Sequence, residues 1–308
     1  MPFDSIFRPG LFAGQTVIVT GGGSGIGRCT AHELAHLGAT VVLVGRTAAK
    51  LANVAAEIAE VGGTALTFTC DIREEAQVRD VVQQVLARQG RIDGLVNNAG
   101  GQFAAPLATI SQRGWDAVVR NNLTGGFLFA RECYTQWMSD HGGAIVNMVA
   151  DFFGSMVGMG HSGAARAGMV SFTETAAVEW GQSGVRVNAI APGWIASSGM
   201  HTYPEWMRPH LRVMHRAIPL QRLGTESEIS AAICFLLSPA AAFVSGITLR
   251  VDGAAPNARL ASPLSAMLPG APENATRGEC TWPLGEHERS KPWDGFHLAC
   301  PSKLFADE

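Results

Sequence analysis

Four polar side chains that could take part in catalysis lie between residues 151 and 166. The imidazole of His161 changes charge near neutral pH and could carry a proton, and the carboxyl group of Asp151 could do the same. Arg166 stays protonated, so it could hold hydroxyl groups but could not relay a proton. The Ser162 hydroxyl is too weakly acidic for that task. Both titratable groups also fit structural roles, with His161 closing a loop or facing solvent and Asp151 shaping a turn.

A glycine-rich stretch earlier in the chain predicts a dinucleotide site. The sequence TGGGSGIG at residues 20–27 follows a β-branched run and opens a helical segment. Gly21 permits a tight turn, Gly25 lets the backbone approach a pyrophosphate, and Gly27 lets the helix pack closely on the strand. The N–H groups of the helix N-terminus would then face the phosphates. We therefore expect the cofactor phosphates beside Gly21, Gly23, Ser24, Gly25, Ile26 and Gly27.

Arg46, about twenty residues further on, bears on the type of cofactor. A carboxylate here would bind ribose hydroxyls and favour NAD, whereas a guanidinium suits the 2′-phosphate of NADP(H). We expect NADP(H), although simple stacking of Arg46 on adenine would allow NAD instead. Asp71, followed by Ile72, comes at the end of a third β-branched run. Asp71 could bind the adenine amino group or cap the following helix.

Alternating strand and helix patterns must position these residues. Continuous apolar runs of strand length alternate with longer segments that carry apolar residues at three- and four-residue spacing. This alternation is typical of an α/β fold in which helices cover both faces of a parallel sheet. The predicted strands are 15–20, 40–45, 65–70, 92–97, 143–149, 185–191 and 246–251, and the clearest helical segments are 25–38, 48–61, 74–89, 114–139 and 163–182.

Composition and charge exclude several classes of protein. With 47% hydrophobic residues, 16% charged residues and a net charge of −3, the chain is globular and has no basic cluster for nucleic acid or an acidic membrane. We expect no transmembrane helix, because no run of about 18 apolar residues occurs. The N-terminus does not resemble a signal peptide. Six widely spaced cysteines without a CxxC pair predict reduced thiols in a cytoplasmic protein, with no metal site.

The character of the chain changes after Gly253. We expect one domain over residues 1–254 and a largely irregular tail over residues 255–308. The tail contains seven of the fifteen prolines and shows little periodicity. Its tryptophans, Trp282 and Trp293, favour partial docking on the domain or on a neighbouring subunit.

Five motifs, taken together, resemble the short-chain dehydrogenase/reductase superfamily in order and spacing. They are TGGGSGIG (20–27), NNAG (97–100), NNLTGGF (121–127), IVN (145–147) and RVNAIAPGWI (186–195). The resemblance covers roughly residues 12–253 and implies a doubly wound Rossmann-type sheet of seven parallel strands. It also implies a homodimer or homotetramer built on the segments 114–139 and 163–182. By resemblance, Asn97, Ala99 and Gly100 border the adenosine, while Pro192, Gly193, Ile195 and Ser197 border the nicotinamide.

The catalytic positions depart from most of that superfamily, which uses Asn, Ser, Tyr and Lys. Asn122 matches the asparagine, but Ser162 stands at the tyrosine position and Arg166 at the lysine position. Neither Tyr134 nor Tyr203 has a lysine or arginine four residues later, so neither restores the motif. A small residue at the tyrosine position resembles the 2,4-dienoyl-CoA reductase branch, although that branch usually keeps the lysine. In that branch, hydrogen-bond donors stabilise charge on a thioester oxygen and water supplies the proton.

These features support three hypotheses about function. The first is an NADP(H)-dependent reductase of an activated C=C bond in an enoyl or dienoyl thioester, with Asn122 and Arg166 as positioning groups. The second is an alcohol or carbonyl oxidoreductase for a hydrophobic, terpenoid-like substrate, with His161 or Asp151 carrying the proton. The third is a dinucleotide-binding protein without turnover. Each takes a small-molecule ligand.

Overall fold

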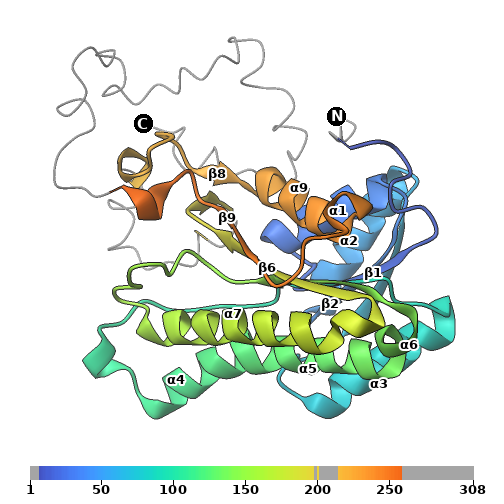
Figure 1. Ribbon diagram of the computed structural model, residues 1–308, viewed down its shortest axis with the longest axis horizontal. Helices are drawn as coiled ribbons and strands as arrows, with labels where there is room; N and C mark the ends of the chain where they lie inside the picture. The colour runs from blue at the N-terminus through green and yellow to red at the C-terminus, as the bar shows by residue number, and fades with distance from the viewer. Residues whose placement is uncertain (1–6, 198–199, 201–213, 259–308) are drawn as a thin grey trace, which may run out of the picture.

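The computed structural model describes residues 7–197, 200 and 214–258, and its centre is a seven-stranded parallel sheet (Figure 1). The strand order is β3-β2-β1-β4-β5-β6-β9. This arrangement confirms the predicted α/β Rossmann-type fold. The strands are β1 (Thr16–Thr20), β2 (Thr40–Gly45), β3 (Thr64–Thr69), β4 (Gly94–Asn97), β5 (Gly143–Met148), β6 (Val185–Pro192) and β9 (Thr248–Val251).

Helices cover both faces of this sheet. On one face, α1 (Gly25–His36), α2 (Ala48–Glu60) and α9 (Glu226–Leu237) enclose one hydrophobic core. On the other face, α3 (Glu75–Gln89), α5 (Gly125–Cys133) and α7 (Gly160–Trp180) enclose a second. The central strands bury side chains on both faces, which explains why their sequences read as continuous apolar runs rather than alternating ones.

The strand order reverses at β1, which pairs with β2 on one side and with β4 on the other. In an open parallel sheet such a reversal leaves a crevice at the carboxyl ends of the strands, where ligands bind. The loops that follow β1, β4, β5 and β6 all leave the sheet at that edge. The glycine-rich loop and most of the predicted site residues therefore meet there.

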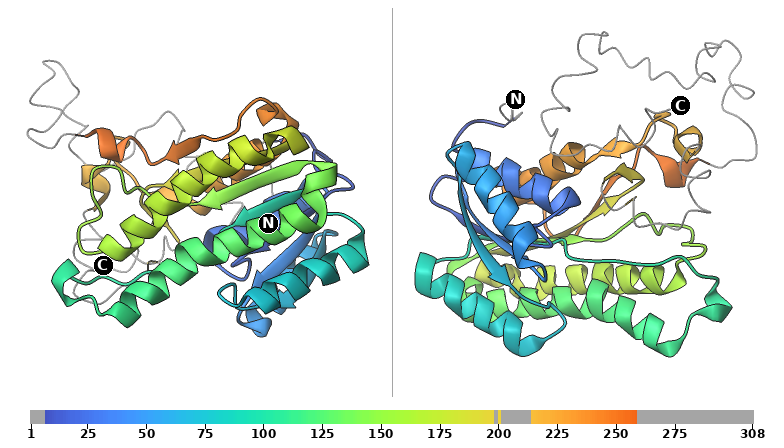
Figure 2. Two further views of the ribbon diagram at one scale, coloured as in Figure 1. Left: turned by 60° about the horizontal axis from the view of Figure 1, so that its bottom comes forward. Right: turned by 180° about the vertical axis from the view of Figure 1, so that it is seen from behind.

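The segment predicted as one helix over residues 114–139 is interrupted. It forms α4 (Gln112–Val119), a π-helical turn (Arg120–Thr124), α5, a second π-helical turn (Tyr134–Met138) and α6 (Ser139–His141). In the first turn, the side-chain amide of Asn122 donates to the carbonyl of Val118 at 2.9 Å. Figure 2 shows this series of helices running alongside α7 on one face of the sheet.

Smaller elements complete the described chain. A two-stranded sheet pairs β7 (Ile195–Ala196) with β8 (Gly224–Thr225), and α9 begins with a capping box between Thr225 and Glu228. Single 3-10 turns occur at Leu107–Thr109, Gly181–Ser183, Met214–Ala217, Pro239–Ala241 and Ala255–Asn257.

Two further expectations are tested only in part. The thiols of Cys29, Cys70, Cys133 and Cys234 are buried and free, and burial raises the pKa of Cys70 to about 12. Cys280, Cys300 and nearly all of the predicted tail lie outside the described residues. Within the described ranges, no helix combines the length and apolar character needed to cross a membrane.

Candidate active site

A cavity of about 860 Å³ runs along the carboxyl ends of the strands. The loops after β2 and β3 form one end, the loops after β5 and β6 form the other, and the glycine-rich loop after β1 lies between them. Most of the predicted site residues line this cavity. They are Gly21, Gly23, Ser24, Gly25, Ile26, Arg46, Asp71, Ile72, Ala99, Gly100, Asp151, Arg166, Pro192, Gly193, Ile195 and Ser197.

The glycine-rich loop is shaped to receive the phosphates of a dinucleotide. Gly21 has a φ of +68°, and a Cβ there would lie 2.8 Å from Nδ2 of Asn98. Gly27 lies behind the loop, where a Cβ would come within 2.4 Å of the carbonyl oxygen of Gly21. Ser24 precedes α1 but makes no side-chain cap, so the N–H groups of the first turn are open to an anion. The geometry therefore fits a pyrophosphate.

Of the two neighbouring asparagines, Asn98 lines the cavity and Asn97, the one predicted to do so, does not. Asn97 is buried and donates to the carbonyl of Gly126 and to Oδ1 of Asn147, both at 2.9 Å. It does not line the cavity, so its predicted contact with the adenosine is corrected to a role in the core. Asn98 lines the cavity and ties the end of β4 to the end of β1, because its amide donates to the carbonyl of Thr20 at 2.9 Å.

Two cationic side chains, those of Arg46 and Lys50, lie at the end of the cavity formed by the loop after β2. Arg46 and Lys50 are exposed, line the cavity and flank Thr47. Within the described part of the chain, Arg46 makes no ion pair with a carboxylate. A positive, unpaired guanidinium at this position suits a phosphate group on the adenosine ribose.

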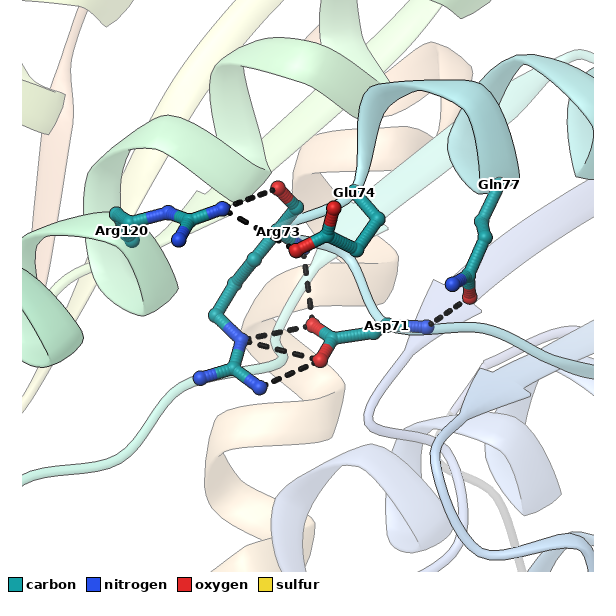
Figure 3. A network of polar contacts seen from close by, with 5 residues as sticks. All are labelled: Asp71, Arg73, Glu74, Gln77 and Arg120. Atoms are coloured by element: carbon teal, nitrogen blue, oxygen red, sulfur yellow. Dashed lines mark hydrogen bonds and ion pairs between the residues drawn. The ribbon is translucent and has the colours of Figure 1, made fainter.

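Asp71 belongs to a polar network that the sequence did not suggest (Figure 3). Its carboxylate accepts hydrogen bonds from Nε of Arg73 at 2.9 and 3.1 Å, and these bonds lower the pKa of Asp71 to about 2. Arg120 joins the network by donating to the carbonyl of Arg73 and to Glu74. The N-cap of α3 is Glu74, so Asp71 closes the turn before the helix instead of capping it. Its contact with adenine remains a prediction.

Arg166 extends from α7 toward the end of β5. Nη1 donates to the carbonyl of Met148, and Nε has no hydrogen-bond partner. The residue is only 8% exposed, and burial lowers its pKa to about 10. No carboxylate of the described chain forms an ion pair with it. Arg166 is therefore a buried positive charge at the cavity wall.

Asn122 holds the backbone of the adjacent loop rather than facing the cavity. Its amide donates to the carbonyl of Gly101 at 2.7 Å, and its Oδ1 accepts from the N–H of Gly101 at 3.1 Å. Gly100 is confined between these groups, since a Cβ there would lie 2.7 Å from Oδ1 of Asn122 and 2.8 Å from Nη2 of Arg166. Asn122 is thus a positioning residue.

The predicted catalytic roles of His161 and Ser162 do not agree with their positions. Both are fully buried and neither lines the cavity. Nδ1 of His161 accepts the N–H of Ser162 at 2.9 Å, and its ring packs edge-on against Phe103. The Ser162 hydroxyl donates to Oε1 of Gln102 at 2.6 Å, and Gln102 does line the cavity. These two side chains lie behind the cavity wall and support it.

Asp151 is the carboxylic acid of the predicted catalytic set, and it reaches the cavity. Its N–H donates to the carbonyl of Pro192, which fixes the loop after β5 to the end of β6. Burial and the nearby negative charge of Asp252 raise the pKa of Asp151 above its usual range. Asp252 itself is paired with Arg250 at 2.7 Å. Asp151 can therefore hold a proton at a higher pH than an exposed aspartate.

Comparison with known proteins places the chain in a family. The family model described as enoyl-(acyl carrier protein) reductase matches residues 21–254. The solved structure of a citronellol catabolism dehydrogenase (AtuB), from Pseudomonas aeruginosa PAO1, is 62% identical, with a TM-score of 0.75, over 82% of this chain and 100% of that one. The chain is a short-chain dehydrogenase/reductase. The hypothesis of a binding protein without turnover gives way, because the family and its relatives are NAD(P)-dependent oxidoreductases.

Two curated relatives of this dehydrogenase/reductase are both named 2,4-dienoyl-CoA reductases. A probable 2,4-dienoyl-CoA reductase from Bacillus subtilis (strain 168) is 38% identical, over 78% of this chain and 95% of the relative. A peroxisomal 2,4-dienoyl-CoA reductase from Danio rerio is 35% identical, over 82% of this chain and 85% of the relative. The resemblance to that branch is thereby confirmed.

The dehydrogenase/reductase also has cavity residues outside the predicted set. The loop after β5 and the segment after β6 contribute an apolar wall rich in methionine, and flexible thioethers adapt to irregular ligands. Gln102 had no signal in the sequence, because its importance depends on the contact with Ser162 across the fold. The further lining residues are Gly45, Thr47, Lys50, Leu51, Cys70, Asn98, Gly101, Gln102, Asn121, Met148, Val149, Ala150, Ser155, Met156, Val157, Met159, Trp194 and Met200.

Proposed function

We propose that this enzyme uses NADPH to reduce the conjugated C=C bond of an enoyl or dienoyl thioester. The observation that carries the proposal is the charge of Arg166 at the cavity wall without a phenol beside it. Among the described lining residues there is no tyrosine. Tyr134 lies elsewhere, bonded to Ser183 and stacked on Trp180, and Tyr203 lies outside the described residues.

This arrangement suits a reaction in which charge, rather than an acidic proton, is supplied at the substrate oxygen. Bound NADPH provides the hydride. When hydride adds to the far carbon of a conjugated thioester, negative charge develops on the thioester oxygen, and fixed positive charge stabilises it. Arg166 supplies such a charge. Asp151, or a water molecule beside it, can deliver the proton to carbon.

The choice of NADPH rests on the adenosine end of the cavity. Arg46 and Lys50 provide two cations there, and neither has a carboxylate as ion-pair partner among the described residues. A 2′-phosphate would neutralise them, whereas the hydroxyl of NAD(H) would not. The names of the two dienoyl-CoA reductase relatives support the thioester substrate.

An acyclic terpenoid alcohol or aldehyde is the second candidate substrate. It is favoured by the similarity to the 62% identical dehydrogenase, whose name refers to citronellol catabolism. The methionines Met148, Met156, Met159 and Met200 offer a flexible apolar wall for a branched chain. Asp151 would then exchange the proton of the substrate oxygen.

We also propose that the enzyme assembles into a dimer or tetramer in the cytoplasm. Phe127 on α5 and Val178 on α7 are 38% and 81% exposed on the face predicted to pair. Exposed apolar residues on adjacent helices favour burial against a second copy. Free, buried cysteines in the described chain support a reducing compartment.

The deciding experiment follows nicotinamide absorbance at steady state and in stopped flow with NADPH and, separately, NADH. The panel contains a 2,4-dienoyl-CoA, a 2-enoyl-CoA, citronellol and citronellal. Oxidation of NADPH by a conjugated thioester alone supports the first candidate. Turnover of the alcohol or aldehyde alone overturns it and supports the second.

A further inference from the structure

The charged groups of the cavity differ in how they are neutralised. Asp71 is bound by Arg73, and Asp151 lies beside the Asp252–Arg250 ion pair. Arg166 is the buried exception among the described lining residues, because it has no carboxylate partner and its Nε has no hydrogen-bond partner. A buried charge without a counter-ion lowers the free energy of unfolding. We therefore attribute the presence of Arg166 to an interaction with a ligand.

The position of Arg166 identifies the part of the dinucleotide that it would meet. Nη1 is fixed on the carbonyl of Met148, the last residue of β5. The adjacent strand β6 ends in Pro192, which lines the same cavity. Arg46 lines the cavity after β2, on the other side of β1. In this fold a dinucleotide spans the point where the strand order reverses, so Arg166 belongs to the nicotinamide half.

The two forms of the cofactor differ in charge only in that half. The oxidised nicotinamide ring carries a positive charge, whereas the reduced ring is neutral. The phosphates and the adenosine are identical in both forms, so their interactions with Arg46 and with the glycine-rich loop cancel in a comparison. A fixed cation beside the ring therefore disfavours the oxidised form alone.

We propose that Arg166 makes this enzyme bind the reduced cofactor in preference to the oxidised one, so that the reduced form occupies the site and the oxidised form dissociates more readily. The inference needs only the family's cofactor class, and it holds whichever substrate is reduced. It also explains the choice of arginine over lysine. Arginine keeps its charge through burial, whereas a buried lysine loses its proton more readily.

The test compares dissociation constants and requires no turnover. NADPH binding is measured by fluorescence titration and NADP+ binding by calorimetry, for the wild type and for Arg166→Gln, Arg166→Lys and Arg46→Gln. We expect Arg166→Gln to lower the ratio of the dissociation constant for NADP+ to that for NADPH on the order of tenfold, because one unit charge is removed near the ring. The variant would then discriminate less against the oxidised cofactor. Arg166→Lys should lower the ratio less.

Arg46→Gln is the matched control, since it should weaken both forms by the same factor and leave the ratio unchanged. Equal weakening of both forms by Arg166→Gln would overturn the proposal and reduce Arg166 to a ribose-binding residue. If Arg166→Gln does not fold, Arg166→Met gives the same comparison. If the wild type binds NADPH more tightly than NADP+ but turns over no thioester, the proposed substrate is wrong and this inference still holds.

Discussion

The hydroxyl of Ser162 donates a hydrogen bond of 2.6 Å to Oε1 of Gln102, which joins the start of α7 to the loop after β4. Ser162 occupies the position where most of the family has its tyrosine, yet it does not reach the cavity. Ser162 acts on the cavity through its hydrogen bond to Gln102, which lines the cavity. At this position the side chain supports the cavity wall.

Replacement of Ser162 by alanine should therefore affect rate but not proton transfer. We expect Ser162→Ala to lower kcat by about two- to tenfold, because Gln102 loses one of the bonds that fix its amide. The pH profile of kcat should stay as in the wild type. Ser162→Thr, which keeps the hydroxyl, is the control. A loss of several hundredfold with an altered pH profile would instead show that Ser162 takes part in proton transfer.

Asp151 predicts a pH dependence of activity. Its raised pKa keeps part of the carboxyl group protonated at a higher pH than usual. If it delivers the proton, the reduction rate falls as the pH rises through that pKa. Asp151→Asn should remove this limb and lower kcat by about 10- to 100-fold. An unchanged profile in Asp151→Asn would assign the proton to water alone.

The same aspartate predicts a pH dependence of stability. Because the pKa of Asp151 is higher in the folded chain than in the unfolded one, its ionisation disfavours the fold. The protonated carboxyl group of Asp151 favours the folded state. This effect is complete below the pKa of the unfolded chain, about 3.9, and is lost as the pH rises through the higher pKa of the folded chain. Asp151→Asn should melt at a higher temperature than the wild type at pH 7, and the difference should vanish near pH 4. Thermal scans from pH 4 to 8 measure this directly.

Arg46 predicts the selectivity between the two dinucleotides. We expect Arg46→Gln to raise KM for NADPH by about 10- to 100-fold and to leave KM for NADH nearly unchanged, since only the former has a 2′-phosphate. Steady-state kinetics with both cofactors provide the measurement. Lys50→Gln should have a smaller effect in the same direction. Equal KM values for NADPH in the wild type and in Arg46→Gln would contradict the assignment to NADP(H).

The buried charge of Arg166 is expected to lower the stability of the ligand-free protein. Removing a buried charge that has no counter-ion should stabilise the protein without ligand, so we expect Arg166→Met to raise its free energy of unfolding by about 1–3 kcal/mol. The lost hydrogen bond to Met148 opposes this gain and sets its lower limit. Denaturant unfolding of the ligand-free protein is the measurement. Destabilisation would mean that Arg166 is mainly a structural link between α7 and β5.

The fold could be predicted because its signals are local. Each strand is a short apolar run, each helix has its own periodicity, and the glycine loop joins a strand to a helix within residues 20–27. The π-helical turn at Arg120–Thr124 was not predicted, because it depends on bonds from Asn122 to Val118 and to Gly101. The latter contact crosses between loop and helix, and no periodicity records it.

The sequence by itself determined the Rossmann-type sheet and the family, and it predicted a glycine loop for a dinucleotide with Ser162 and Arg166 at the tyrosine and lysine positions. These depend on residue types at fixed spacing. Only the tertiary structure decided which polar groups reach the cavity. In the folded protein, His161 and Ser162 lie behind the cavity wall, whereas Asp151 and Gln102 line the cavity. Arg166 is buried at the wall, and no carboxylate of the described residues pairs with it. Burial and charge pairing arise between segments that are distant along the chain, so spacing alone cannot specify them.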